Sequence, residues 1–298
     1  MVTSAPIGIL ICTRNRGRGL KATLDSIVNA AESSPADIHV VIVDNGSTDA
    51  TPEVVREWSE CQSFRVTTLV EPLPGLARSR NTGLAAVNSS IICMTDDDCV
   101  LDRNFFGKVN EAFSDESGPA IIGGRIDLGD EEDLPITIKT SQLAETLGED
   151  EFPGGFIMGA NLAFNAEALT MIGEFDERFG AGARFVAAED TDFLYRAQLL
   201  RIPVRYNPGF AVKHFHGRRH DRQAADLSRG YNFGDGAFFA KYFRTDPRVR
   251  QALLQNVRWS IAEIRRPGDL KFGIKRFATF KLHHRIRGMI AYWRQSNL

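Results

Sequence analysis

An acidic triplet directly follows one of the most apolar stretches of the chain. Asp96, Asp97 and Asp98 come after residues 91–94, an apolar run with the length of a buried strand. Carboxylates at a strand end lie at the rim of a sheet, where they repel one another unless a cation neutralises them. Because side chains at i and i+2 of an extended segment share a face, we expect Asp96 and Asp98 to form one site and Asp97 to point elsewhere. The spacing fits Mg²⁺ or Mn²⁺ on a diphosphate, and the alternative is a solvated loop that caps the next helix.

Two other acidic segments are candidates for the same site. Asp44 follows the apolar run 40–43 and opens the turn Asp-Asn-Gly-Ser-Thr-Asp, so its carboxylate can accept a hydrogen bond from a nucleobase N–H. Taken alone, this segment is an ordinary turn. Glu189 and Asp190 have the composition of a helix N-terminus, where acidic residues interact favourably with the helix dipole. A carboxylate at the edge of a pocket is also what a general base for an acceptor hydroxyl requires.

Basic side chains accompany the acidic ones. His214 and His216 alternate along a predicted strand, so both imidazoles share one face, where they can complete a metal site or contact a diphosphate. The arginines that follow them favour phosphate, and the alternative is a pair of surface histidines. Arg80 lies near the start of the helix that precedes the acidic triplet, where the alternative is a solvated helix face.

The elements that must position these residues are apolar strands that alternate with helical segments. Strands that are apolar throughout and separated by helices indicate parallel βαβ units with both faces of the sheet covered. In such sheets ligands bind at the carboxyl ends of the strands, which is where Thr13, Asp44 and Asp96 fall. We predict strands at residues 7–12, 40–43, 64–69 and 91–94, and helices at 20–31, 51–58 and 76–87.

The pattern is weaker after residue 101 and changes character near residue 237. From there onward it is helical and basic, which predicts an α/β domain at 1–236, built on a mixed, mainly parallel sheet flanked by helices, and a helical C-terminal extension at 237–298. Between these limits we predict strands at 120–124, 204–206 and 211–215, an acidic loop at 129–135, and helices at 166–172 and 189–200.

The charge of the chain is distributed unevenly. A formal net charge of −2 combines a basic segment, with 14 Lys and Arg against three acidic residues in 241–298, with an acidic remainder. Apolar residues alternate with the basic ones, which favours packing on the domain or contact with an anionic membrane surface. Nucleic-acid binding fits poorly, because the body is acidic and carries no nucleic-acid motif. No stretch approaches the ~20 apolar residues of a membrane span and no signal-peptide layout is present, so we expect a cytoplasmic protein, peripheral on the inner face of the plasma membrane where the basic segment binds lipid.

An ordered set of short motifs resembles family 2 nucleotide-sugar glycosyltransferases of the GT-A fold. The resemblance spans about residues 6–216, and the ordered set is specific although each motif is short. It implies a Rossmann-like GT-A domain in which residues 1–101 bind the nucleotide and residues 102–236 form the acceptor half. The motifs are residues 12–16 (CTRNR), 43–49 (VDNGSTD), 75–83 (GLARSRNTG), 95–98 (TDDD), 159–164 (GANLAF), 172–177 (IGEFDE) and 189–192 (EDTD).

The resemblance implies a role for each matching position. The residues expected to contact the donor nucleotide, with the carboxylate of the second motif reading the base, are Thr13, Arg14, Asp44, Arg80, Asn81 and Asp96. The expected metal ligands are Asp98, Asp96 and His214, and His216 is expected to contact the phosphate. The sugar and acceptor cleft would be lined by Gly159, Ala160, Asn161 and Glu189, and Asp190 would be the catalytic base.

The implied reaction is an inverting displacement at the anomeric carbon. The base deprotonates an acceptor hydroxyl, and Mn²⁺ or Mg²⁺ stabilises the departing nucleoside diphosphate. The implied partners are a nucleotide-diphosphate sugar and a saccharide or lipid-linked acceptor, in the synthesis of cell-envelope polysaccharide or glycolipid. Residues 229–234 would form a mobile loop over the donor or a plain connecting loop. Cys99 stands where many relatives carry another acid, which bears on the metal ligand set. The tryptophan motif of processive synthases is not evident and membrane spans are missing, so we expect addition of one or few sugars.

Two other functions are weighed against this one. A sugar nucleotidyltransferase would carry a glycine-rich loop with a following lysine directly after the first strand, whereas here Gly17 and Gly19 are separated by Arg18. A non-catalytic nucleotide-sugar-binding or scaffold protein would bind the nucleotide without turnover.

Overall fold

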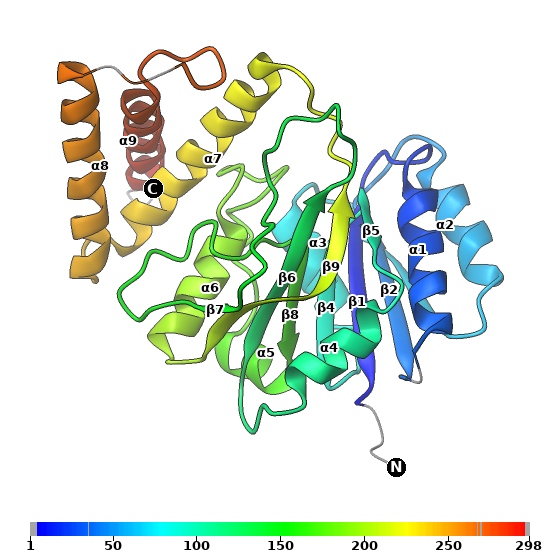
Figure 1. The fold of residues 1–298 in the computed structure, drawn as a ribbon. Coiled ribbons are helices and arrows are strands. Elements are labelled where there is room, and N and C mark those ends of the chain that lie inside the picture. Colours follow the sequence, from blue (N-terminus) through cyan, green and yellow to red (C-terminus); the bar gives the residue numbers. More distant parts are fainter. Residues whose placement is uncertain (1–4, 35, 267, 269, 296–298) are drawn as a thin grey trace.

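One large sheet forms the centre of the molecule, with helices on both of its faces and three long helices standing to one side (Figure 1). The computed structural model describes residues 5–34, 36–266, 268 and 270–295. Within these ranges nine strands pair in the order β3-β2-β1-β4-β8-β6-β9-β5, with β7 on β9. The strands are β1 (Ile7–Thr13), β2 (Ile38–Asp44), β3 (Arg65–Val70), β4 (Ile91–Asp96), β5 (Cys99–Leu101), β6 (Ile121–Leu128), β7 (Glu145–Thr146), β8 (Asn161–Asn165) and β9 (Val204–His214). The helices are α1 (Leu20–Glu32), α2 (Thr51–Glu60), α3 (Leu76–Leu84), α4 (Phe105–Phe113), α5 (Ala166–Ile172), α6 (Glu189–Leu199), α7 (Asp221–Tyr242), α8 (Pro247–Arg265) and α9 (Phe277–Gln295).

The strand directions bring the predicted functional residues to one edge of the sheet. β1, β2, β3, β4, β6 and β9 run the same way, whereas β8 runs antiparallel to its neighbours β4 and β6. The carboxyl ends of the parallel strands therefore meet at one edge, called here the carboxyl edge, where Thr13, Asp44, Asp96 and His214 end β1, β2, β4 and β9. The reversed β8 begins at the same edge, since its first residue, Asn161, pairs with the end of β4.

Alternating side chains on the central strands build two apolar cores. Ile7, Ile9 and Ile11 of β1 pack with α1, α2 and α4 on one face, and Leu10 packs with α3, α5 and α6 on the other. Each of these four residues is at most 1% exposed, and burial of one such side chain stabilises the fold by about 1.5–3 kcal/mol. A one-residue slip of β1 would exchange the two faces. The register that builds the cores therefore also fixes which residues reach the carboxyl edge.

Most predicted elements lie where the sequence indicates them, and the differences fall after residue 98, where β5, β7 and β8 were also not predicted. The predictions did not include α4, although Asn104 before it and the apolar Phe105, Phe106 and Val109 within it have helical spacing. The two late strands predicted at 204–206 and 211–215 form the single strand β9. Its ladder with β6 shifts register opposite the segment that contains Pro208, which explains the weak strand signal there.

The prediction of a loop at 229–234 is wrong, because these residues lie in the middle of α7. Gly234 suggests flexibility in the sequence, but it serves a close contact: a Cβ at this position would lie 2.6 Å from the carbonyl oxygen of Ala187. α7 begins at Asp221, so the helical part of the chain starts well before the predicted boundary at 237. That boundary falls inside one continuous helix.

The C-terminal helices pack on the domain and on one another (Figure 1). A third apolar core joins Phe179 and Phe185 of the domain to Phe238 of α7 and Met289 of α9. Of the two outcomes left open for this segment, packing on the domain is therefore observed, and membrane contact stays a prediction. Among the described helices, none combines the length and the apolar composition that crossing a lipid bilayer would demand.

Two glycines let α7 and α9 approach closely. A Cβ on Gly236 would lie 2.0 Å from the carbonyl oxygen of Arg285, and a Cβ on Gly288 would lie 2.0 Å from that of Phe233. Side chains at either position would force the helices apart, so small residues are required at this crossing.

Candidate active site

The loop after β1 and the turn after β2 are joined by reciprocal hydrogen bonds. The backbone N–H of Asn15 donates to Ser47 Oγ over 2.9 Å, and Asn15 Oδ1 accepts from the N–H of Thr48 over 2.8 Å. The N–H of Arg16 donates to Thr51 Oγ1 over 2.8 Å. Asn15 has a positive φ of 53°, a conformation that asparagine tolerates better than most residues. The two segments therefore hold each other in place at the carboxyl edge.

Asp44, predicted to read a nucleobase, lies in this paired region. It is 7% exposed, and its Oδ1 accepts from the N–H of Ser47 over 3.0 Å. Thr13 is buried beside the acidic triplet, whereas Arg14 is exposed on the loop. These three predicted nucleotide residues thus lie at one end of the sheet. Among the described residues, no polar contact fixes the orientation of the Arg14 side chain.

The acidic triplet is held by two side chains from the β1 end of the sheet. Thr13 Oγ1 donates to Asp97 Oδ2 over 2.7 Å, and Arg16 Nε donates to Asp97 Oδ1 over 3.0 Å. The same guanidinium binds Asp98 through Nη2. The expectation that Asp97 stands apart from the site is wrong, because Arg16 joins it to Asp98.

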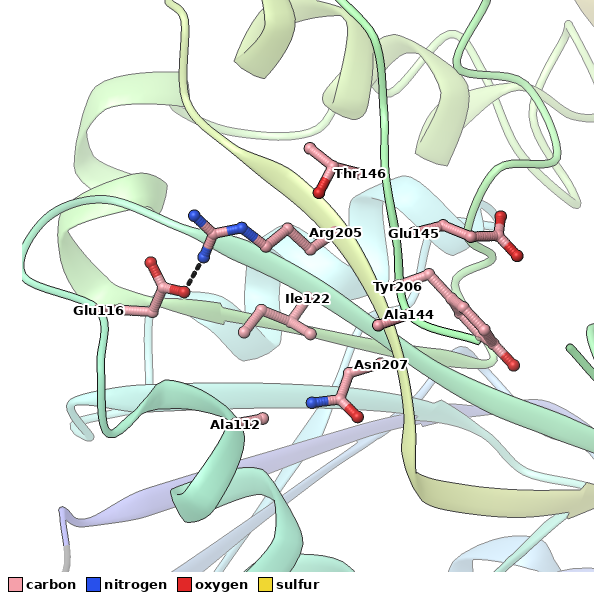
Figure 2. A pocket seen from close by; sticks show the side chains of 9 residues that line it. All are labelled: Ala112, Glu116, Ile122, Ala144, Glu145, Thr146, Arg205, Tyr206 and Asn207. Carbon is pink, nitrogen blue, oxygen red and sulfur yellow. Dashed lines mark hydrogen bonds and ion pairs between the residues drawn. The ribbon is translucent and has the colours of Figure 1, made fainter. Parts of the chain in front are cut away.

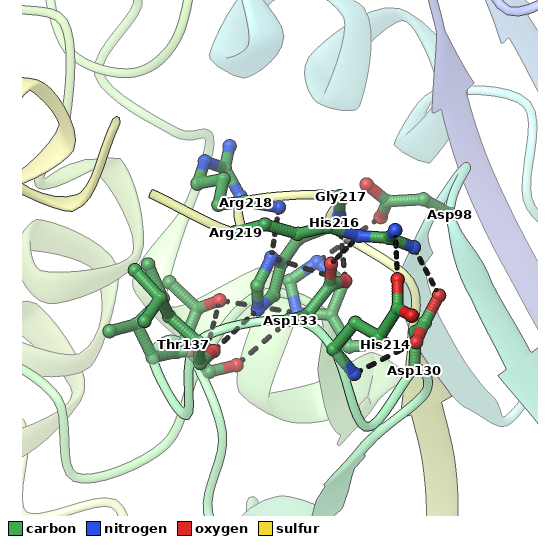
Figure 3. Close-up of polar contacts among 12 residues, drawn as sticks. Asp98, Asp130, Asp133, Thr137, His214, His216, Gly217, Arg218 and Arg219 are labelled. Carbon is green, nitrogen blue, oxygen red and sulfur yellow. Dashed lines mark hydrogen bonds and ion pairs between the residues drawn. The ribbon is translucent and has the colours of Figure 1, made fainter. Parts of the chain in front are cut away.

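Asp98 also pairs with His214, where β5 begins beside the end of β9 (Figure 3). His214 Nε2 lies 3.2 Å from Asp98 Oδ1, and its Nδ1 lies 3.2 Å from the carbonyl oxygen of Thr137. Burial acts to lower the pKa of His214, but the hydrogen bond and charge of Asp98 outweigh it and raise this pKa. Burial acts to raise the pKa of Asp98, but His214 and Arg16 keep it below its ordinary value. The pair therefore favours its charged form.

The donor set at this point fits a hard divalent cation. Ligand atoms of Asp98, Cys99 and His214 all lie within 4.8 Å of one another. Burial, with the charges of the neighbouring Asp96 and Asp98, raises the pKa of the Cys99 thiol well above its ordinary value, which makes this sulfur a poor ligand for Mn²⁺ or Mg²⁺. Carboxylate and imidazole suit these ions, so Asp98 and His214 are the fitting ligands. The predicted third ligand, Asp96, instead lies 3.7 Å from Arg80 Nη2.

His216 is engaged by protein groups in this structure, and its contact with a phosphate stays a prediction. Its side chain is fully buried, and both ring nitrogens are occupied: Nε2 donates to the carbonyl oxygen of Leu134 over 3.1 Å, and Nδ1 accepts from the N–H of Arg218 over 3.0 Å. Its neighbour Arg219 reaches the acidic loop, with Nη2 2.6 Å from Asp130 Oδ2 (Figure 3). His216 thus helps to hold this loop beside β9.

Arg80 is a buried cation between two carboxylates. Its side chain is 4% exposed, with Nη1 3.0 Å from Glu189 Oε1 and Nη2 3.7 Å from Asp96 Oδ1. Gly159 leaves room for it, because a Cβ there would lie 2.4 Å from Arg80 Nη2. Burial, followed by the charge of Asp190, raises the pKa of Glu189 to about 7, while Arg80 opposes the shift. Arg80 therefore links the end of β4 to the start of α6.

Asp190, predicted to be the catalytic base, is the more accessible acid at the start of α6. It is half-buried, whereas Glu189 is buried. Its Oδ1 accepts from the N–H of Thr191 over 2.6 Å and its Oδ2 accepts from the N–H of Gly159 over 3.4 Å. Ala188 before the helix has a positive φ of 76°, a strained conformation for a residue with a side chain. The chain thus turns sharply to place these two acids at the carboxyl edge.

The side chains of two predicted site residues hydrogen-bond to backbone groups instead of facing open space. The Asn81 amide donates to the carbonyl oxygen of Phe175 over 2.9 Å and accepts from its N–H over 2.8 Å. Asn161 is 1% exposed, and its amide donates to the carbonyl oxygen of Arg125 over 2.8 Å. Ala160 is buried, and its carbonyl oxygen accepts from a threonine on β4. These residues shape the site; their contacts with a ligand stay predictions.

Sequence reasoning assigned no role to two residues that the structure places in the site. The position of Arg16 in the motif after β1 could have marked it as a site residue. Nothing in the sequence shows, however, that its side chain reaches the acidic triplet. Thr137, which contacts His214 through its carbonyl oxygen, lies within the long loop between β6 and β7 and has no sequence signal. It also has a positive φ of 54°.

A cavity of about 160 Å³ lies apart from this site (Figure 2). Residues at the start of β9 line it, and among them Arg205 points toward Glu116 and forms an ion pair with it. Because β9 ends at His214, the cavity is at the opposite end of the strand from the carboxyl edge. None of the predicted site residues lines it.

Comparison with known proteins identifies the fold and the sequence family of this arrangement. The family model described as glycosyl transferase family 2 matches residues 8–170, more than half of the chain. The chain is similar to the probable glycosyltransferase YdaM of Bacillus subtilis, with 25% identity over 68% of this chain and 49% of that protein. It is also similar to the pre-mycofactocin glycosyltransferase of Mycobacterium tuberculosis, with 24% identity over 70% of this chain and 43% of that protein. It thus spans less than half the length of either relative.

Among solved structures, the chain is similar to the mannosyltransferase PcManGT from Pyrobaculum calidifontis in complex with GDP-Man and Mn²⁺. The TM-score is 0.61 at 18% identity, over 98% of this chain and 88% of that one. At this identity the likeness shows the fold alone, and it confirms the predicted GT-A fold.

Proposed function

Because the chain belongs to glycosyl transferase family 2, we propose that it is an inverting, metal-dependent glycosyltransferase acting on a nucleotide-diphosphate sugar and a hydroxyl acceptor. One arrangement carries the proposal: Asp98 and His214 form a carboxylate–imidazole pair at the carboxyl edge, and the half-buried Asp190 stands at the start of α6 on the same edge. Arg80 connects the two parts through its ion pairs.

In this proposal residues 1–101 bind the donor nucleotide and residues 102–236 shape the acceptor side. Thr13 and Arg14 line the nucleotide, and the carboxylate of Asp44 accepts from an N–H of the base. Asp96 and Arg80 lie toward the ribose and donor sugar. Support comes from the paired loops after β1 and β2, which present these residues on a prearranged surface.

Asp98 and His214 would hold Mn²⁺ or Mg²⁺ at the carboxyl edge. When bound, such an ion neutralises charge on the diphosphate as it leaves. The protein prepares the ligands, since the carbonyl oxygen of Thr137 fixes the His214 ring and the pKa of Asp98 is lowered.

Asp190 performs the proton transfer in this proposal. The acceptor hydroxyl oxygen forms a bond to the anomeric carbon of the donor, and the bond from that carbon to the diphosphate oxygen breaks. The electron pair leaves with the nucleoside diphosphate, and the hydroxyl proton passes to the Asp190 carboxylate. The N–H groups of Thr191 and Gly159 orient this carboxylate, and the buried Glu189 is held by Arg80 and so is a poorer candidate for the base.

The acceptor in this proposal is a saccharide or a lipid-linked saccharide of the cell envelope. A lipid-linked acceptor fits the surface of α8, where Leu254, Arg258, Ile261 and Arg265 follow one another at helical spacing and are all exposed. Exposed apolar and cationic side chains on one helix face suit an anionic lipid surface on the inner side of the plasma membrane.

The proposed reaction is tested by donor binding and turnover together. We expect one of UDP, GDP, CDP or dTDP to raise the melting temperature with Mn²⁺ or Mg²⁺, and EDTA to remove the shift. Asp190→Asn should retain this binding while transfer falls by about 10²–10⁴-fold. Asp226→Asn, an acid-to-amide change at an exposed position of α7, is the matched control and should transfer normally. Transfer by Asp190→Asn at the wild-type rate would exclude this residue as the base.

The proposed membrane contact has its own test. We expect the protein to sediment with phosphatidylglycerol vesicles more than with phosphatidylcholine vesicles, and the double variant Leu254→Ser/Ile261→Ser to lose this difference. A double change of exposed apolar residues elsewhere, Leu143→Ser/Met171→Ser, is the control. Equal sedimentation of both double variants would rule out α8 as the contact.

A further inference from the structure

Arg16 occupies the place where a cation is needed. Its guanidinium binds Asp98, the proposed metal ligand, and lies 3.0 Å from Asp97 Oδ1 through Nε. The two carboxylates are each 16% exposed, whereas the Arg16 side chain is 37% exposed. The cation can therefore leave toward solvent while the carboxylates stay where the backbone holds them. Arg16 binds Asp98 through Oδ2, whereas His214 faces Oδ1. A metal ion held between Oδ1 and His214 would lie close to this guanidinium, and an ion that binds both carboxylate oxygens must displace it.

The backbone of Arg16 belongs to the proposed nucleotide surface. Its N–H donates to Thr51 Oγ1, and the N–H of the next residue, Gly17, donates to Asp49 Oδ2 over 3.0 Å. The Arg16 carbonyl oxygen accepts from the N–H groups of Gly19, directly before α1, and Leu20, its first residue, over 2.9 Å each. The main chain is thus fixed between the turn after β2 and α1, while the side chain is the movable part.

We propose that Arg16 is an internal counter-ion that a divalent cation displaces only together with an anionic diphosphate. The inference rests on the proposed function above. Without the diphosphate, a metal ion that takes Asp98 leaves Arg16 with Asp97 as its one described anionic partner, and the ion meets the repulsion of the guanidinium at close range. With the diphosphate present, the freed guanidinium gains phosphate oxygens, for which its fork of N–H donors is well suited. Arg16 therefore couples the two binding events.

This coupling has a measurable signature. Binding linkage is reciprocal, so the nucleotide must raise the affinity for the metal by the same factor as the metal raises the affinity for the nucleotide. Arg16 is a positioning residue in this account, because it acts through Asp98 and the diphosphate. Removing the charge of Arg16 should raise the affinity for the metal ion when no nucleotide is present. It should also reduce the ratio between the metal affinities measured with and without nucleotide.

The experiment is a titration of Mn²⁺ followed by the electron paramagnetic resonance signal of the free ion. Wild type, Arg16→Gln, Arg16→Lys and Arg18→Gln are titrated with Mn²⁺ alone and then with saturating GDP or UDP. Arg18 is the matched control, since it lies in the same loop, is exposed and has no ion pair among the described residues. Melting temperatures of all four proteins show that each is folded.

We expect wild type and Arg18→Gln to bind Mn²⁺ at least about tenfold more tightly with nucleotide than without it. Arg16→Gln should bind Mn²⁺ alone more tightly than wild type, and Arg16→Lys, which keeps the charge, should lie between them. Equal affinity of wild type and Arg16→Gln for Mn²⁺ alone would overturn the inference and leave the proposed function intact. If no protein binds Mn²⁺ even with nucleotide, the proposed metal dependence fails, and the inference fails with it.

Discussion

Two arginines neutralise carboxylates at the same edge of the sheet, and they do so in different surroundings. Arg80 lies between Glu189 and Asp96 with 4% of its side chain exposed, whereas Arg16 binds Asp97 and Asp98 with 37% exposed. A buried ion pair cannot lose one partner without leaving an uncompensated charge in a poorly solvated place. A half-exposed pair exchanges its partner for water or another ion at small cost. The site therefore has a fixed part around α6, where the arginine keeps its carboxylate partners. It also has an exchangeable part around the acidic triplet, where the arginine can be replaced by another cation.

The strongest test of this comparison is to remove the buried cation. Arg80→Met should lower the free energy of unfolding by about 3–5 kcal/mol, because the buried Glu189 loses its charged partner. Denaturant titration measures the loss. Arg78→Met is the control on the same helix. The Arg78 side chain is 34% exposed, and its ion-pair partner Glu177 is 37% exposed. A loss at Arg80 no larger than that at Arg78 would remove the distinction between the fixed and exchangeable parts.

The buried pair should also make stability depend on pH. The pKa of Glu189 is about 7 in the folded protein against an ordinary value of 4.5, so the folded state holds a proton that the unfolded chain has released. The stabilising contribution is therefore complete below pH 4.5 and is lost as the pH rises through about 7, on the order of 1–3 kcal/mol. Denaturant titrations at pH 5 and pH 8 should show a larger loss for wild type than for Glu189→Gln, which cannot titrate. Parallel losses would show that Glu189 is not the responsible group.

A smaller effect is expected where the backbone makes room for Arg80. Gly159→Ala would bring a Cβ to 2.4 Å from Arg80 Nη2, and the guanidinium cannot move freely between its two carboxylates. We expect a loss of about 1–3 kcal/mol in unfolding free energy, typical of overpacking. Gly118→Ala, where a Cβ meets nothing within 4 Å, should leave stability within about 0.5 kcal/mol. Wild-type stability of Gly159→Ala would mean that Arg80 adapts easily and is not tightly held.

The smallest effect on stability should come from the exchangeable cation. Arg16→Gln should change the free energy of unfolding by less than about 1 kcal/mol, and added salt should reduce even this difference. The same denaturant titration at low and high salt measures it. A loss comparable to that of Arg80→Met would place Arg16 in the fixed part and contradict the comparison.

The first ninety-six residues were predictable because β1, β2 and β4 are almost entirely apolar and α1 and α2 carry a regular apolar stripe. The carboxyl edge followed from that pattern, and Thr13, Asp44 and Asp96 do end or directly follow their strands. The second half resisted prediction because β6, β8 and β9 mix directions and β9 carries an irregular ladder opposite Gly124. Alternation along the chain does not reveal which strand a distant segment will pair with.

The candidate site divides in the same way. The motifs identified the residues that stand at strand and helix ends, but they could not show which side chains share a cation. Arg16 and Asp97 meet across 81 positions of sequence, and His216 faces the interior because an acidic loop closes over it. Such contacts depend on packing between segments that are distant in the chain, so only the three-dimensional arrangement reveals them.

α7 has a consequence for how this molecule can change over evolutionary time. Near its end, Lys241 Nζ and the Tyr242 hydroxyl both donate to Asp192 Oδ1, over 2.6 and 2.9 Å, and Asp192 lies on α6 two positions after Asp190. Its middle rests on the carbonyl oxygen of Ala187, directly before the strained turn. A tail joined in this way cannot be exchanged between relatives as a module, because a new tail would have to restore the buried partners of α6. Drift in the last sixty residues is therefore constrained by the contacts that hold the start of α6.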